Sequence, residues 1–141
     1  MKLLYAKSEV EGARWEDYVR ASPWATCYHS WNWKQVIERS FGWPTYYLMA
    51  VEGDRVAGVL PLVWQRSVLF GSFMTSLPFF NAGGILADSH EIQRFLIDEA
   101  VAVARKNGAA SIEFRHREPH ELGLPVKSNK VTMILPIHGD A

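Results

Sequence analysis

Two neighbouring glycines, Gly83 and Gly84, mark the part of the sequence best suited to bind a ligand. They lie just before a predicted helix start, and glycine lets a peptide or glycan come close to the backbone. Asn81, two residues earlier, could orient a substrate amide. The alternative is structural: these residues also suit a tight turn or bulge at positive φ, which needs no ligand.

A second group of polar residues, Arg115, His116 and Arg117, follows a predicted strand. Ligand groups often lie at strand ends in open α/β sheets. The two guanidinium groups could hold a carboxylate or phosphate, and His116 could take up a proton near neutral pH. A solvated loop with local ion pairs is the alternative. His116, Glu118 and His120 do not match a familiar zinc spacing, so we predict no metal site.

Other reactive or aromatic side chains are scattered along the chain. Cys27 is predicted to be a small buried side chain rather than a nucleophile. His29, just before a helix, is predicted to be partly buried and bonded to backbone. The 6 tryptophans are predicted to pack mostly in the core. Exposure of Trp31, Trp43 and Trp64 would instead indicate a surface that binds glycan or peptide.

The elements that must position these residues change in type along the chain. Apolar periodicity and turn signals predict a strand over 2–6, helices over 13–21 and after Ser30, strands over 45–51, 56–64 and 68–77. Residues 52–55 have turn composition, so the second and third strands should form an antiparallel hairpin. Pro61 within that hairpin predicts an edge, a bulge or a break in pairing.

A further helix is predicted after the glycines. Asp88 and Glu91 have the spacing of a capping box, and the Asn107-Gly108 pair suits the helix end. Strands near 73–77 and 111–115 would complete a β-α-β unit, and a last strand is predicted near 130–135. We therefore expect an α/β (α+β) fold with a mixed, mostly antiparallel sheet flanked by helices. A cleft should open beside the two glycines.

Composition limits the classes of function. The chain has 141 residues with 48% apolar residues, which suits one folded domain. Its formal net charge of +0 argues against an electrostatic nucleic-acid binder. No apolar run is long enough to span a bilayer, and Cys27 is the single cysteine, so a cytoplasmic location is expected.

The predicted order of elements resembles the GNAT acyltransferase fold. More specifically, several stretches resemble the first half of FemAB-like proteins: TCYHSWNWKQVIERSFGWPTYYLMAVEGDRVAGVLPLV, FGSFMTSLPFFNAGGILAD, IEFRHRE and KSNKVTMILP. The resemblance implies that residues 1–141 form a single GNAT-like domain, the N-terminal half of a two-domain transferase. The whole enzyme would move an acyl or aminoacyl group, from a donor such as aminoacyl-tRNA or acyl-CoA, to an amine of a cell-wall peptide or polysaccharide precursor.

By this resemblance, the present half would shape the acceptor groove. The substrate-binding candidates are Phe79, Phe80, Asn81, Gly83, Gly84, Arg115 and Arg117. A GNAT donor loop typically begins with a basic or amide side chain, which residues 81–88 lack at the motif spacing, and Asp88 would repel a pyrophosphate. We therefore expect no cofactor here. The alternatives are a non-catalytic glycan- or peptide-binding module and a stand-alone N-acetyltransferase with an atypical donor loop. A homodimer could replace a missing C-terminal domain.

Overall fold

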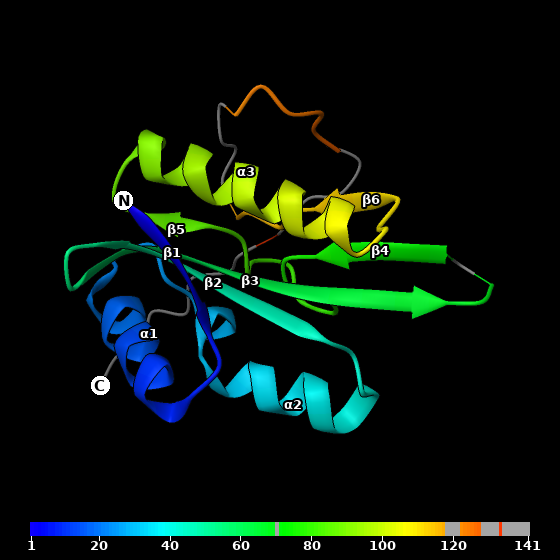
Figure 1. The fold of residues 1–141 in the computed structure, drawn as a ribbon, viewed down its shortest axis with the longest axis horizontal. Helices are drawn as coiled ribbons and strands as arrows, with labels where there is room; N and C mark the ends of the chain where they lie inside the picture. The colour runs from blue at the N-terminus through cyan, green and yellow to red at the C-terminus, as the bar shows by residue number, and fades with distance from the viewer. Residues whose placement is uncertain (70, 118–121, 128–132, 134–141) are drawn as a thin grey trace.

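The computed structural model describes residues 1–69, 71–117, 122–127 and 133, which form a sheet with helices on both faces (Figure 1). In chain order the elements are β1 (Lys2–Ala6), α1 (Glu9–Ala21), the 3-10 turn η1 (Cys27–His29), α2 (Asn32–Phe41), β2 (Thr45–Glu52), β3 (Arg55–Ser67), β4 (Gly71–Thr75), β5 (Leu86–Ala87), α3 (His90–Lys106) and β6 (Ser111–Glu113). The strand order is β1-β2-β3-β4-β6, with β5 also paired to β3. Only the β4–β6 pairing among these strands is parallel, so the predicted fold class is confirmed.

The two faces of the sheet bury different sets of side chains. Helix α3 covers one face, and α1 and α2 cover the other (Figure 1). Successive side chains of a strand point to opposite faces, and β2 follows this rule. Leu48 packs in the cluster that contains Leu96 of α3, whereas Tyr47 and Met49 pack with Trp15 of α1. Because both faces of β2 are covered, its central residues are apolar without alternation.

The strand next to β3 is interrupted. Strand β3 pairs with β5 through Gly58 and Val59 and with β4 through residues 63–67, both antiparallel. Between β4 and β5 the chain leaves the sheet as a segment that we call the 76–85 loop. Pro61 lies in the part of β3 where the register pairs it only with β2. The break in pairing predicted from Pro61 is therefore confirmed on this side.

The two N-terminal helices differ from their predicted form in detail. Helix α1 begins at Glu9, earlier than expected, because Ser8 and Glu11 form a capping box that the prediction missed. Helix α2 follows Trp31, whose own backbone is already helical, so Ser30 is not its N-cap residue. Gly42 ends α2 in the left-handed conformation at φ 65°, as predicted.

Two expectations concern the rest of the chain. Most of the strand predicted near 130–135 lies outside the described residues. Within the described ranges, the helices are all too short or too polar to cross a bilayer.

Candidate functional site

The 76–85 loop carries most of the residues that the sequence predicted to bind substrate. Phe79 is 61% exposed and has the positive φ of 72°, which strains a residue with a side chain. Its ring is stacked on Trp43 at 5.9 Å between ring centroids. Phe80 is partly covered because it packs against Tyr28, at 4.8 Å. Asn81 is exposed. These three side chains therefore point to different surroundings and do not form one groove wall.

Arg115 holds the 76–85 loop against the end of β6. Its guanidinium donates to the carbonyl of Phe80 at 3.1 Å and to the carboxylate of Glu113 at 2.7 Å. This hydrogen bond with Arg115 is the main reason that the pKa of Glu113 is lowered. The backbone N–H of Arg115 donates to Oγ of the buried Ser76 at 2.9 Å. Arg115 thus binds the protein's own loop, while Arg117 is exposed.

The corner beside the two glycines is filled, whereas the sequence predicted an open cleft. Gly83 and Gly84 are buried, and neither has positive φ. A Cβ on Gly84 would lie 2.5 Å from Cδ2 of His116, and one on Gly83 would lie 2.9 Å from Cβ of Leu77. The Nε2 atom of His116 accepts a hydrogen bond from the N–H of Ile85 at 3.1 Å. Close packing, and not a turn at positive φ, therefore requires glycine here.

His29 supports the same loop from the other side. Its Nδ1 accepts from the N–H of Thr26 at 3.0 Å, and Thr26 Oγ1 donates to the carbonyl of Ala82 at 2.8 Å. Burial lowers the pKa of His29 to about 4, so the ring is neutral at physiological pH. The prediction of a backbone-bonded histidine is confirmed. Cys27, predicted to be buried, is exposed.

The tryptophans do not form the exposed surface that a glycan-binding module would need at the predicted positions. Trp31 is buried, and Trp43 and Trp64 are partly covered. Trp24, by contrast, is 77% exposed.

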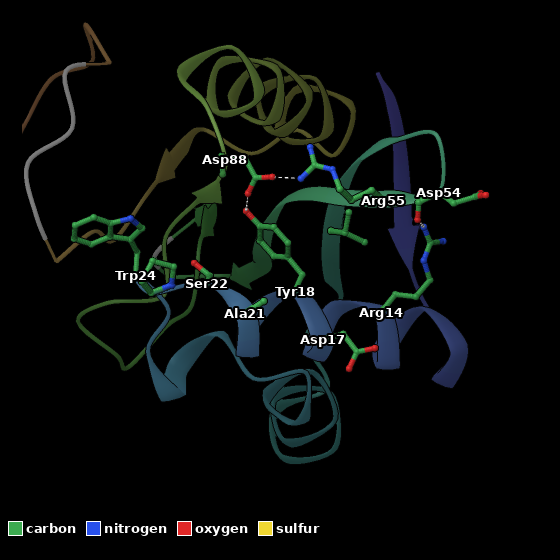
Figure 2. A pocket seen from close by; sticks show the side chains of 12 residues that line it. Arg14, Asp17, Tyr18, Ala21, Ser22, Trp24, Asp54, Arg55 and Asp88 are labelled. Atoms are coloured by element: carbon green, nitrogen blue, oxygen red, sulfur yellow. Dashed lines mark hydrogen bonds and ion pairs between the residues drawn. The ribbon is translucent and has the colours of Figure 1, made fainter.

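An open pocket of about 650 Å³ lies on the α1 side of the sheet, and Figure 2 shows its lining. We call it the α1 pocket. Its walls come from the outer side of α1, the segment after α1, the β2–β3 turn and the junction of β5 with α3. They are formed by Arg14, Asp17, Tyr18, Ala21, Ser22, Pro23, Trp24, Asp54, Arg55, Val56, Ala87 and Asp88.

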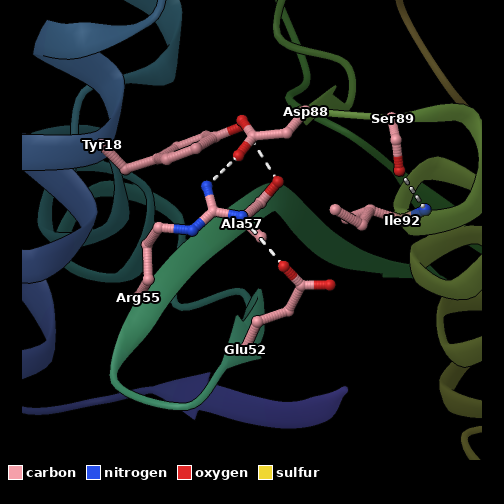
Figure 3. Close-up of polar contacts among 7 residues, drawn as sticks. All are labelled: Tyr18, Glu52, Arg55, Ala57, Asp88, Ser89 and Ile92. Atoms are coloured by element: carbon pink, nitrogen blue, oxygen red, sulfur yellow. Dashed lines mark hydrogen bonds and ion pairs between the residues drawn. The ribbon is translucent and has the colours of Figure 1, made fainter.

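The centre of the α1 pocket is a polar network around Asp88 (Figure 3). The hydroxyl of Tyr18 lies 2.9 Å from Asp88 Oδ1 and 3.2 Å from the carbonyl of Ala57. Arg55 forms an ion pair with Asp88 and another with Glu52 at 2.9 Å. Burial, helped by the bond to Asp88, raises the pKa of Tyr18, so its hydroxyl stays a donor.

Asp88 was predicted to cap α3, and this prediction is wrong. The N-cap residue is Ser89, whose Oγ accepts from the N–H of Ile92 at 3.3 Å. The N–H of Asp88 instead donates to the carbonyl of Ala57 at 3.0 Å, which leaves its carboxylate free to turn toward α1. The other pocket residues were not predicted, because they come from segments far apart in the sequence.

The start of α3 does not suit a pyrophosphate. A helix N-terminus attracts anions through its free N–H groups. Here Asp88 and Glu91 place negative charge beside that end, and Oγ of Ser89 already binds the N–H of Ile92. Arg55 is the nearby cation that could compensate, and it is bound by Asp88 and Glu52. The residues present therefore do not fit the phosphates of an acyl-CoA at this position.

Comparison with known proteins gives structural matches only: no family model and no curated sequence matches the chain. An apo aminoglycoside 6'-N-acetyltransferase, AAC(6')-IG from Acinetobacter haemolyticus, has a TM-score of 0.59 and 14% identity, covering 98% of this chain and 100% of that chain. The chain has the fold of the GNAT acetyltransferases. A probable acetyltransferase has a TM-score of 0.55 at 14% identity, covering 99% of this chain and 100% of its own. A tetramutant of the BH1408 protein from Bacillus halodurans has a TM-score of 0.52 at 14% identity, covering 97% and 100%.

The corner at Gly84 and the α1 pocket are both close to β5 in the chain. The end of the 76–85 loop and the segment that follows the parallel strand β6 together form the corner that holds Gly84 and His116. Within the described residues there is no group of His, Cys, Asp or Glu side chains that could hold a metal ion. Along the chain, the filled corner at Gly84 therefore precedes β5, and Asp88 of the open α1 pocket follows it.

Proposed function

We propose that this chain is the acceptor-binding domain of an acyltransferase, and that it serves as the N-terminal half of a FemAB-like, two-domain enzyme. The observation that carries the proposal is the contrast between the two ends of β5. His116 closes the corner next to Gly84, while the α1 pocket beside Asp88 stays open. The GNAT fold supports acyl transfer as the reaction class.

In this proposal the acyl donor binds elsewhere, on a second domain or a second copy of the chain. The start of α3 carries Asp88 and Glu91, which would repel the phosphates of acyl-CoA. The N–H of Ile85, at the filled corner, is already bound by His116. A donor that must lie in this corner would have to displace an imidazole that is packed against a buried glycine.

The acceptor is proposed to be an amine of a cell-wall peptide or a polysaccharide precursor, bound in the α1 pocket. The exposed side chains among the predicted groove residues are proposed to extend the acceptor surface; these are Phe79 and Asn81 on the 76–85 loop and Arg117 after β6. Arg115, Gly83 and Gly84 would act indirectly, by fixing the position of that loop.

Calorimetry with acetyl-CoA tests whether this chain alone binds an acyl donor. The proposal predicts no measurable heat and no transfer of the acetyl group to small amines by this chain alone. Analytical ultracentrifugation of the same sample shows whether two copies associate. Tight binding of acetyl-CoA with turnover by a monomer would refute the proposal and favour a stand-alone N-acetyltransferase.

A further inference from the structure

We infer that one end of this domain docks on a lipid bilayer that contains anionic phospholipid. The docking surface is the far end of the β3–β4 hairpin together with the C-terminal ends of α2 and α3 beside it, and we call it the hairpin end. The inference goes beyond the proposed function and does not depend on it, because it concerns neither the acyl donor nor the acceptor. It depends on two exposed apolar side chains, on their position in the fold and on the charge around them.

The β3–β4 hairpin extends past the strands on either side of it. Strand β2 begins at Thr45, which pairs with Val63, and β6 begins at Ser111, which pairs with Phe73. Strand β3 nevertheless continues to Ser67. The hairpin therefore reaches farther out than α2 and α3 along the longest axis of the molecule (Figure 1). An element in this position meets a flat surface before the rest of the domain does.

Two apolar side chains lie where β3 ends. Val68 is fully exposed, and Leu69 is 86% exposed. Hairpin turns favour Gly, Asn, Asp and Ser, and here Gly71 already supplies the left-handed conformation, with a φ of 80°. Neither the turn nor the core therefore accounts for the two apolar residues. Neighbouring apolar side chains that stay exposed are typical of an interaction surface.

The charged residues of the hairpin end are all cations. Its segments are 39–45, 64–69, 71–75 and 103–112, which contain Arg39, Arg66, Arg105 and Lys106 and no Asp or Glu. All four cations are exposed. The whole chain has a formal net charge of +0, so positive charge is concentrated at this end.

The carboxylates that border these segments are already paired. Glu38 forms an ion pair with Lys34 at 2.5 Å, and Glu113 forms one with Arg115 at 2.7 Å. They therefore do little to offset the cations of the hairpin end.

The position of Arg66 is the part of this charge that helix stability does not explain. Bases in the last turn of a helix stabilise its C-terminus, which accounts for the cations of α2 and α3. Arg66 lies on a strand instead, close to the apolar tip. Its guanidinium lies over the ring of Trp64, 4.5 Å from the ring centroid. This stacking holds the cation at the side of the hairpin, where it can reach a phosphate as the tip enters the bilayer.

Aromatic rings lie at the base of the same hairpin. The N–H of Trp64 donates to the carbonyl of Pro44 at 2.9 Å, which places the end of α2 beside β3. Phe41 and Trp43 stack there at 4.8 Å between ring centroids, and Phe41 is exposed. Amphipathic aromatic side chains are enriched at the boundary between lipid and water.

An apolar tip surrounded by cations matches an anionic bilayer better than it matches other partners. Apolar side chains enter the boundary between headgroups and acyl chains, while Arg and Lys bind the phosphates. A second copy of the chain that met this one through the same end would bring the cations of both copies together. A nucleic acid would bind the cations but leave Val68 and Leu69 in water.

Flotation with vesicles tests the inference. The whole chain is mixed at low salt with vesicles of equal parts phosphatidylcholine and phosphatidylglycerol, or of phosphatidylcholine alone. We expect the chain to float with the anionic vesicles and to remain at the bottom of the gradient with the neutral ones. Raising the salt concentration should weaken the binding, because it screens the attraction between the cations and the lipid.

Matched substitutions localise the contact to the hairpin. The double variant Val68→Ser/Leu69→Ser should bind the anionic vesicles at least about tenfold more weakly, because two apolar side chains no longer enter the bilayer. Val10→Ser replaces an exposed valine of α1 and is the control, which should change nothing. Thermal melting of each variant confirms that it is folded.

A second pair of substitutions tests the charge. Arg66→Gln should weaken the binding about fivefold, as expected for the loss of one cation near an anionic surface. Arg94→Gln removes an exposed arginine near the start of α3, away from the hairpin end, and should have no effect.

A fluorophore reports whether the tip enters the lipid. In a Cys27→Ser background, an environment-sensitive label on Leu69→Cys should shift to shorter wavelength when anionic vesicles are added. The same label on Asp54→Cys, in the turn at the other end of β3, should not shift.

Several results would overturn the inference. These are no flotation with anionic vesicles, equal flotation with neutral ones, and unchanged binding by the double serine variant. Self-association that this variant abolishes, seen by ultracentrifugation without flotation, would assign the hairpin end to a second copy. Binding of double-stranded DNA without flotation would assign its cations to nucleic acid. Acetyl-CoA is absent from all of these measurements, so the proposed function is tested separately.

Discussion

The buried His29 makes the stability of this domain depend on pH in a defined window. His29 is 4% exposed, and burial lowers its pKa from 6.5 to about 4. Below pH 6.5 the unfolded chain binds a proton at this residue, while the folded chain does not do so until about pH 4. The contribution of His29 to the free energy of unfolding is therefore greatest above pH 6.5 and falls as the pH is lowered toward 4.

The magnitude follows from the two pKa values. Each pKa unit corresponds to about 1.4 kcal/mol, so lowering the pH from 7.5 to 5 should reduce the free energy of unfolding by about 2 kcal/mol through His29 alone. Urea denaturation at a series of pH values measures this change. Because other groups also titrate, the decisive quantity is the difference between the natural chain and the His29→Gln variant. Glutamine keeps a side-chain oxygen that can accept from Thr26, and it cannot take up a proton.

We expect the variant to be less stable at pH 7.5 and to lose about 2 kcal/mol less than the natural chain between pH 7.5 and 5. His90→Gln is the matched control, since His90 is an exposed imidazole at the first residue of α3. It measures what the exchange of an exposed histidine for glutamine does to the same denaturation curves. The reasoning is refuted if His29→Gln and the natural chain have the same slope across this window.

Three further substitutions test the packing around the site. Gly84→Ala should destabilise the domain by about 2 kcal/mol or more, because the new Cβ would lie 2.7 Å from the carbonyl of Arg115 as well as against His116; urea denaturation measures the loss. Ser89→Ala should cost about 1 kcal/mol and speed amide exchange in the first turn of α3, because the N–H of Ile92 loses its side-chain acceptor. Gly58→Ala should cost about 1–3 kcal/mol, since its Cβ would lie 2.7 Å from Cγ2 of an isoleucine of α3; an unchanged denaturation midpoint would contradict the packing described.

The elements that depend on local signals could be predicted from the sequence. The β2–β3 hairpin is an example, because Gly53 takes the positive φ of 58° that its turn needs. The end of α2 at Gly42 is another. The β4–β6 pairing followed from an amphipathic helix between two short apolar segments.

The contacts that depend on distant segments could not be predicted. Asp88 and Ser89 are both good capping residues, and the sequence alone does not choose between them. The choice is made by tertiary structure: the backbone of Asp88 is bound to Ala57, and its carboxylate is bound by Tyr18 and Arg55. The α1 pocket was not predicted for the same reason. Trp24 and Asp54, at its two ends, are far apart in the sequence.

Part of α2 shows that apolar spacing alone does not identify the core. Val36, Ile37 and Phe41 have the helical spacing of one apolar face, yet only Ile37 of these three is buried. Val36 is 43% exposed and Phe41 is 46% exposed. Phe41 instead stacks on Trp43 at 4.8 Å, in the cluster that also receives Phe79. The apolar spacing was correct, but part of it serves a surface aromatic cluster that periodicity cannot distinguish from a core.

Asp88 connects the open pocket with the unfavourable donor corner. The same carboxylate that accepts from Tyr18 and pairs with Arg55 also places negative charge beside the start of α3. A substitution that removed this charge from the helix end would therefore also remove the Asp88 contacts with Tyr18 of α1 and Arg55 of β3. Under the proposed function, one side chain would thus link acceptor binding to donor exclusion, as a domain that holds only the acceptor requires.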